Sequence, residues 1–281
     1  MPFLPSMIFW RAIQRLSAIH KQYLMKKTIK EKLLYNLATV AIIMVVASPA
    51  WATSYAPLTS SASVFTGDGW NMFANDDGTL APGYGGQYFD AEYFFYKIEG
   101  STLSIGLQAG FNVVTGVQTY SSYKYYAGDI ALSFDGSTAN GYEYAIDFGH
   151  VTKDYQLDNV GTGGVHAAGL YSVTTWNNDM YSSFISASSP FAMATGTKAA
   201  DITIATGDGG TSSNHYYYEI ATFDVSGIAG SNPFIMDAHW TMSCGNDSIN
   251  GRAEVTVPEP STLILLASCL LGFGVFVTLK T

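Results

Sequence analysis

Short acidic turns carry the side chains of this sequence that are best suited to binding a metal. Each of the carboxylates lies within two positions of a glycine, and they belong to Asp68, Asp76, Asp77 and Asp208. Carboxylates in loops with free backbone carbonyls are the hard oxygen ligands that Ca²⁺ prefers. None of the turns completes an EF-hand or a repeated glycine-rich pattern, and ordinary turns also favour Asp before Gly. One calcium ion and plain turn chemistry therefore stay open as alternatives, and no cofactor is certain.

Other carboxylates fall on predicted strands, namely those of Glu92, Glu99, Glu143, Asp147 and Glu219. Glycoside hydrolysis needs two carboxylates roughly 5 to 9.5 Å apart. Glu143 and Asp147 share one strand face, but four residues of strand separate them by about 13 Å. The sequence also contains no serine-nucleophile elbow and no phosphate-binding loop. We therefore expect no enzyme, and a glycan-active enzyme is the least favoured alternative.

Aromatic residues could supply a sugar-binding surface, because Tyr and Trp rings stack on pyranose faces. The candidates are Trp70, Tyr84, Tyr88, Tyr171, Trp176, Tyr181, Tyr216, Tyr217 and Tyr218. Strand faces and sandwich cores are also rich in aromatics, and core packing is the more common role. We interpret His150, His166, His215 and His239 as isolated surface or loop residues. Cys244 is expected to be a buried small hydrophobe or a site of intermolecular pairing.

The elements that must position these residues show the period-two pattern of β-strands. Strands are predicted at 87–98, 102–114, 129–134, 142–148, 170–175, 201–205, 215–224, 237–243 and 252–257, with a tight turn at Gly100 and Ser101. No amphipathic helix is evident between them. Residues 53–256 are therefore predicted to form an all-β domain, an antiparallel β-sandwich of jelly-roll type.

The charge of this domain excludes one class of partner. Residues 53–257 contain five Lys or Arg and twenty Asp or Glu, whereas residues 1–52 are basic. Binding to phosphate backbones needs a basic surface. Nucleic acid is therefore not expected as a partner, and the acidity favours cations or neutral glycans.

The N-terminal segment has the pattern of a secretory signal. Basic residues at 25–32 precede an apolar run at 33–47, and Ala50 and Ala52 form an A-x-A site before Thr53. Residues 1–52 are therefore predicted to be a signal peptide recognised by the secretion translocon, with a signal helix, and to be cleaved after Ala52. Residues 1–24 fit poorly before such a signal, and Met25 is an alternative start.

The C-terminal segment 257–281 combines a proline-containing motif with an apolar stretch. The motif consists of Val257, Pro258, Glu259, Pro260, Ser261 and Thr262. Residues 262–279 would span about 27 Å as a helix, which is close to the thickness of a bilayer core. Lys280 suits a cytoplasmic end. A transmembrane helix is therefore predicted after the motif.

This ending resembles the PEP-CTERM sorting signal of bacterial surface proteins, although its usual terminal arginines are reduced to Lys280. The resemblance implies recognition of Pro258, Glu259 and Pro260 by the membrane protease exosortase. It also implies a Gram-negative host that makes exopolysaccharide. Blocks at 75–78, 83–92 and 239–247 likewise resemble a group of exosortase-dependent surface proteins, for which no activity can be carried over.

These observations predict an exported protein that is first anchored in the inner membrane and then reaches the cell surface or extracellular matrix. Its expected role is structural or adhesive, close to exopolysaccharide and biofilm material. The alternative is a lectin-like module that binds carbohydrate with the help of calcium.

Overall fold

The computed structural model describes most of the predicted domain. The described residues are 53–54, 61–67, 69–139, 141–152, 165–178, 180, 185–229 and 233–257. All of them belong to the unit 51–281, which is separate from the unit 1–50. The predicted signal peptide and the predicted tail helix lie outside the described residues. Thr53, the first residue after the predicted cleavage site, is described.

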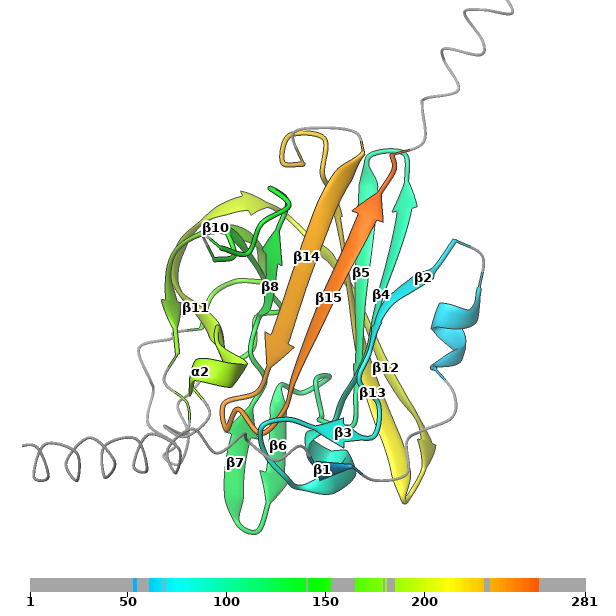
Figure 1. The fold of residues 1–281 in the computed structure, drawn as a ribbon, viewed down its shortest axis with the longest axis vertical. Helices are drawn as coiled ribbons and strands as arrows, with labels where there is room; N and C mark the ends of the chain where they lie inside the picture. The colour runs from blue at the N-terminus through cyan, green and yellow to red at the C-terminus, as the bar shows by residue number, and fades with distance from the viewer. Residues whose placement is uncertain are drawn as a thin grey trace, which may run out of the picture. The chain divides into compact units, whose positions relative to one another are not determined.

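The described chain is all-β, as predicted, and every strand pairing is antiparallel. One sheet has six strands (Figure 1). In spatial order they are β11 (Ala192–Ala200), β10 (Gly169–Asn177), β9 (Tyr144–Asp147), β8 (Ile130–Ser133), β14 (Phe234–Thr241) and β15 (Ser248–Val255).

A second sheet has five strands. In spatial order they are β12 (Thr203–Thr211), β13 (Asn214–Asp224), β5 (Thr102–Ala109), β4 (Ala91–Glu99) and β2 (Asn71–Asn75). Two small sheets pair β1 (Thr53–Ser54) with β3 (Thr79–Leu80) and β6 (Val117–Tyr120) with β7 (Tyr123–Tyr126). The short helices are η1 (Ser63–Thr66), η2 (Gly86–Phe89) and α2 (Ile185–Ser188).

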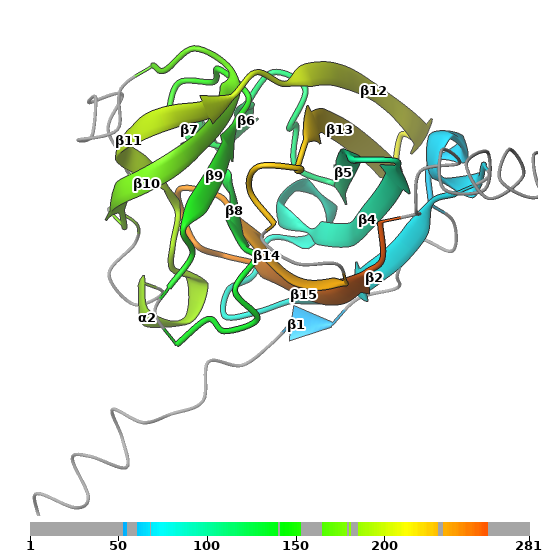
Figure 2. The ribbon, with the colours of Figure 1, turned by 90° about the horizontal axis from the view of Figure 1, so that it is seen from above.

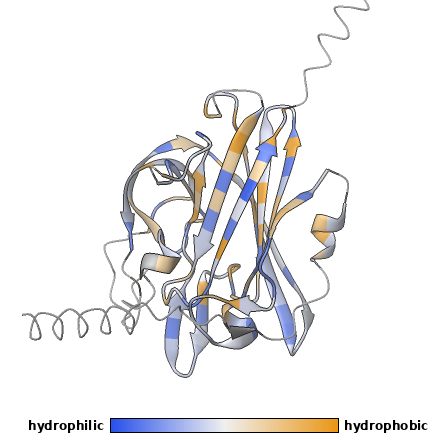
Figure 3. Ribbon diagram, viewed as in Figure 1, coloured by the Kyte–Doolittle hydropathy of each residue, from blue (hydrophilic) through white to orange (hydrophobic). Residues whose placement is uncertain are grey.

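One hydrophobic core receives side chains from both large sheets. Alternate residues of β5, including Leu103, Ile105 and Leu107, are fully buried, and Trp240 of β14 belongs to the same cluster. Seen from above, the two sheets curve around this shared interior (Figure 2). Hydrophobic and hydrophilic residues alternate along the strands (Figure 3), because successive side chains of a strand point to opposite faces. The indole N–H of Trp240 is satisfied by the carbonyl of Gly128 at 3.1 Å.

A smaller cluster covers the other face of the five-stranded sheet. Phe65 of η1 stacks on Phe95 of β4, with ring centroids 4.2 Å apart. Gly106 of β5 makes this contact possible, since a Cβ at that position would lie 2.3 Å from the Phe65 ring. The sheet therefore has apolar cover on both faces where η1 lies.

Several predicted strands differ from the observed ones. The predicted strand 87–98 begins too early, because residues Gly86–Phe89 form the helix η2 and β4 starts at Ala91. The turn at Gly100 and Ser101 is confirmed between β4 and β5. Strands β2, β3, β6, β7 and β11 were not predicted. Their sequences are short or rich in Gly, Ser, Thr and Ala, and they bury few large side chains.

Cys244 and His239 are both buried. Cys244 is 1% exposed, and its burial raises the pKa of the thiol to about 12, which fits the predicted buried hydrophobe. The prediction that His239 is a surface or loop residue was wrong. It lies in β14 and is 1% exposed, with Nδ1 2.9 Å from Asn250 Oδ1 and Nε2 3.0 Å from Ser188 O.

Candidate functional site

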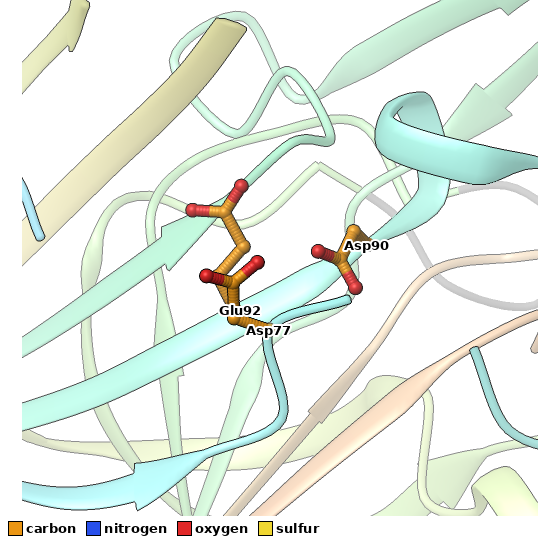
Figure 4. A group of neighbouring side chains, drawn as sticks. All are labelled: Asp77, Asp90 and Glu92. Carbon is orange, nitrogen blue, oxygen red and sulfur yellow. The ribbon is translucent and has the colours of Figure 1, made fainter. Parts of the chain in front are cut away.

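Three carboxylates meet at the start of β4 and form the candidate metal site. One oxygen atom from each of Asp77, Asp90 and Glu92 lies within 4.8 Å of the others (Figure 4). Asp90 and Glu92 are fully buried, and Asp77 is partly buried. No other group of three His, Cys, Asp or Glu side chains approaches this closely in the part of the chain that the structure describes.

The local backbone brings the three side chains together. Asp77 lies in the turn between β2 and β3, where Gly78 adopts a φ of 80° that suits glycine. Asp90 follows η2. Glu92 lies at a β-bulge, since Ala91 pairs with Ala109 whereas Tyr93 pairs with Gln108. A bulge redirects a side chain that regular alternation would send to the other face, and here the Glu92 carboxylate contacts Gln108.

Neutral donors hold these carboxylates in place. Glu92 Oε1 accepts a hydrogen bond from Gln87 Nε2 at 2.5 Å, and Oε2 accepts one from Gln108 Nε2 at 2.6 Å. The backbone N–H of Gly78 donates to Asp90 Oδ2 at 3.1 Å. The hydroxyl of Tyr93 donates to Asp77. Amides and a phenol fix the geometry of the site without adding positive charge.

The electrostatics of the site disfavour three ionised carboxylates. Burial raises the pKa of Glu92 to about 8, and the nearby charges of Asp90 and Asp77 act in the same direction. Burial also raises the pKa of Asp76, in the same turn as Asp77, to about 6. Like charges in a low-dielectric site favour either protonation or an added cation. The donor set of hard oxygens fits Ca²⁺.

Asp247 supports the site from the loop between β14 and β15. Its side chain accepts hydrogen bonds from the backbone N–H groups of Ala81 at 3.1 Å, Ala91 at 2.7 Å and Ser248 at 2.9 Å. Burial raises the pKa of Asp247, while the N–H donors lower it. Asp247 thus ties the start of β4 to the six-stranded sheet.

The structure describes three of the four predicted calcium ligands and does not bring all three together. Asp77 belongs to the carboxylate group, and Asp76 is its neighbour in the turn. Asp208 lies on β12 instead, with Oδ2 3.2 Å from Nε2 of His215. Asp68 lies outside the described residues. Sequence reasoning missed Asp90 as a ligand and took Glu92 only as a strand carboxylate, because a β-bulge leaves no signal in a single sequence.

A second group of ionisable side chains includes Glu219 of the five-stranded sheet and Asp147 of the six-stranded sheet, both of which are buried. Glu219 of β13 is fully buried, and its Oε2 lies 3.6 Å from Nε2 of His150. Asp147 Oδ2 lies 3.3 Å from Nδ1 of His166. Burial raises the pKa of Glu219 to about 7, and burial likewise raises the pKa of Asp129, with the charge of Asp147 acting in the same direction. His150 is therefore not the isolated residue that the sequence predicted.

The strand carboxylates considered for glycoside hydrolysis are dispersed. Glu92 and Glu219 belong to the two groups above. Glu99, at the end of β4, is exposed and pairs with Lys97 at 2.7 Å. Both side-chain oxygens of Glu143 are buried with no hydrogen-bond partner, and Asp147 pairs with His166.

The predicted aromatic platform is also divided. Trp70, Tyr216 and Tyr218 pack against the Phe65 cluster, and Tyr171 packs with Trp176 in the six-stranded sheet. Tyr84 and Tyr88 are exposed, whereas the side chain of Tyr181 lies outside the described residues. Most of the predicted rings therefore pack against other side chains, which is the more common role of aromatic residues in such a domain.

The predicted sorting residues lie at the edge of the described chain. Thr53 is in β1 and Val257 follows β15. Ala50, Ala52, Pro258, Glu259, Pro260, Ser261 and Thr262 lie outside the described residues. Among the described residues, no helix has the length and apolar character needed to cross a membrane.

Comparison with known proteins identifies one segment of the chain. Residues 256–276 match the family described as the PEP-CTERM protein-sorting motif. This match confirms the resemblance that the sequence suggested at Val257 and the residues after it. No curated protein and no solved structure matches the chain.

Proposed function

We propose that this chain, which carries a PEP-CTERM protein-sorting motif at residues 256–276, displays its β-domain at the surface of a Gram-negative cell in a structural or adhesive role. The motif is the observation that carries the proposal, because it implies an exported, envelope-targeted substrate of exosortase. In this proposal the translocon exports the chain, the tail holds it in the inner membrane, and exosortase then releases it towards the exopolysaccharide.

The β-domain suits such an exposed role. We take its two large sheets as the layers of a β-sandwich, since they share one hydrophobic core, and we keep jelly-roll connectivity as the proposed topology. The domain has twenty acidic and five basic side chains over residues 53–257, and such an excess of one sign favours solubility. The proposal assigns the domain no catalytic role.

Sorting can be tested with two glutamates close together in sequence. Glu259 lies within the motif, whereas Glu254 is an exposed residue of β15 outside the matched segment. We expect Glu259→Ala to leave the protein in the inner-membrane fraction, while Glu254→Ala reaches the surface like the wild type. Equal surface levels of the two variants, in cells that contain exosortase, would contradict the proposal.

A lectin-like module that binds carbohydrate with the help of calcium is the second candidate function. The observation that favours it is the convergence of Asp77, Asp90 and Glu92 within 4.8 Å. Calcium binds six to eight oxygens, so these side chains would supply part of a coordination shell that backbone carbonyls and water complete. Isothermal titration with calcium tests this candidate, and loss of heat in Asp77→Asn is the expected result.

A further inference from the structure

An exposed group of tyrosines lies on the hairpin β6–β7 and the helix η2. Tyr88, Tyr120 and Tyr123 are 50%, 42% and 55% exposed, and we call these three residues the tyrosine patch. The ring centroids of Tyr88 and Tyr120 are 6.0 Å apart. Tyr120 and Tyr123 are direct cross-strand partners, so their side chains leave the hairpin on the same face.

The buried ring of Phe89 supports Tyr120 of the patch. The ring of Phe89, which is 2% exposed, contacts Tyr120 edge-on at 5.4 Å and Tyr125 at 5.0 Å. Tyr125 pairs with Gln118 across the hairpin, so it lies on the same hairpin face as Tyr120 and Tyr123. The ring of Tyr120 therefore packs directly on Phe89, and it loses little freedom when a ligand binds.

The turn between the patch tyrosines is unusual. Ser121 and Ser122 adopt φ values of 48° and 71°, and they are the only described non-glycine residues with positive φ. A two-residue hairpin turn with positive φ at both positions normally uses Asn and Gly. Strained backbone of this kind concentrates at functional sites. Here it joins Tyr120 to Tyr123 through two exposed serines, in the turn of the hairpin β6–β7 (Figure 1).

We propose that the tyrosine patch is a stacking surface for a neutral glycan chain, with the hydroxyls of Ser121 and Ser122 at its rim. The inference rests on the exported role proposed above. Tyrosine combines an apolar ring face with a polar hydroxyl, which matches the apolar ring face and peripheral hydroxyls of a pyranose. The acidic excess of residues 53–257 repels polyanions such as nucleic acids and anionic lipid surfaces, whereas a neutral polysaccharide meets no such repulsion.

A second copy of this chain fits the patch less well. A stable protein interface buries roughly 800 Å² on each partner. Three half-exposed tyrosine rings offer only about 300 Å², since an aromatic side chain buries roughly 150 to 250 Å² in full. The area therefore suits a few sugar rings better than a protein surface.

Affinity electrophoresis of the full protein, purified from its own cells, tests the proposal with gels that contain dextran, laminarin or galactomannan, and with alginate as the anionic comparison. We expect at least one neutral polysaccharide to retard the wild type. The double variant Tyr120→Ala, Tyr123→Ala should bind at least tenfold more weakly. The double variant Tyr120→Phe, Tyr123→Phe should stay within about threefold of the wild type, because it keeps the rings. Met72→Ala, which removes a 53% exposed side chain from β2, is the matched control and should behave as wild type.

Several results would overturn the proposal. These are retardation by alginate alone, no retardation by any of the three neutral polysaccharides, and equal retardation of wild type and the Ala double variant. Light scattering measures the oligomeric state of that variant. If the oligomeric state changes while the retardation does not, the patch serves self-association. Tyr88→Ala provides a second, single-site variant should the double variant fail to fold. Cell fractionation of the same variants distinguishes this proposal from the proposed surface role. A variant that loses retardation but is still sorted normally shows a defect in the patch alone.

Discussion

Nε2 of His150 lies 3.6 Å from Oε2 of Glu219, and both atoms are buried with no hydrogen-bond partner. Glu219 comes from the five-stranded sheet, and His150 follows β9 of the six-stranded sheet. This pair therefore places a titratable contact in the interior that the two sheets share. A carboxylate that is buried without donors favours its protonated form.

The stability of the domain should fall as the pH rises from about 5 to 8 in the absence of calcium. Glu219 has a folded-state pKa of about 7 and Glu92 of about 8, against ordinary values near 4.5. Folding thus takes up protons in this range, so the stabilisation is present at acidic pH and is lost as the pH passes the folded-state values. Burial lowers the pKa of His150, but the contact with Glu219 has the larger opposite effect, so the pKa of His150 is raised. This raised pKa also makes the folded domain less stable as the pH rises.

The matched variant for this prediction is Glu219→Gln. It should flatten the pH dependence, because raising the pKa of Glu219 from 4.5 to about 7 corresponds to on the order of 3 kcal/mol. Urea unfolding in EDTA at pH 5.5 and pH 8 measures the difference. Glu254→Gln, an exposed site on β15, should keep the wild-type slope. A wild-type protein that becomes more stable towards pH 8 would refute the account of these buried acids.

Calcium should stabilise the domain most at alkaline pH. At pH 8 more of the Glu92 carboxylate is ionised than at acidic pH, because burial raises its pKa to about 8, and a bound cation would offset its repulsion with Asp77 and Asp90. A ligand at a hundred times its Kd stabilises by about 2.7 kcal/mol. Thermal unfolding with calcium against EDTA should show this gain for the wild type.

Asp77→Asn is the informative variant for calcium, since an amide oxygen can still accept the hydrogen bond from Tyr93. It should lose more than half of the stabilisation by calcium, whereas Asp208→Asn, which removes the carboxylate beside His215, should retain it. Equal responses of the two variants would show that calcium acts elsewhere.

Gly106→Ala should destabilise the domain through a single contact. The added Cβ would lie 2.3 Å from the Phe65 ring, and overpacking of this kind costs about 1–3 kcal/mol. Gly227→Ala, where no atom lies within 4 Å of the new Cβ, is the control. The double variant Phe65→Ala, Gly106→Ala should show a smaller total loss than the sum of the single changes in urea unfolding. Additive losses would mean that the contact with Phe65 is not the cause.

Much of the fold could be predicted because the long strands bury alternate large side chains. Strand β13, for example, alternates from His215 to Asp224, and its observed bounds are Asn214–Asp224. Strand β11, from Ala192 to Ala200, was missed since its Ala, Thr and Gly side chains carry no hydrophobic alternation. Its pairing with β10 depends on tertiary contacts that propensity does not encode.

The candidate site was only partly predictable. The turn that contains Asp77 was visible, because Asn, Asp and Gly are the residues that turns require. Glu92 was visible only as a strand carboxylate. Its direction depends on the bulge between Ala91 and Tyr93, and its partners Gln87 and Gln108 come from an unpredicted helix and a neighbouring strand. Long-range register of this kind cannot be read from one sequence.

The most direct test of the central claim is the intact mass of the protein from cells with and without exosortase. With the protease present, we predict a chain that begins at Thr53 and has lost the apolar tail beyond Pro258, Glu259 and Pro260. Without the protease, the mass should include the tail up to Thr281. A chain that keeps its full tail in exosortase-containing cells would contradict the claim that this motif directs surface processing.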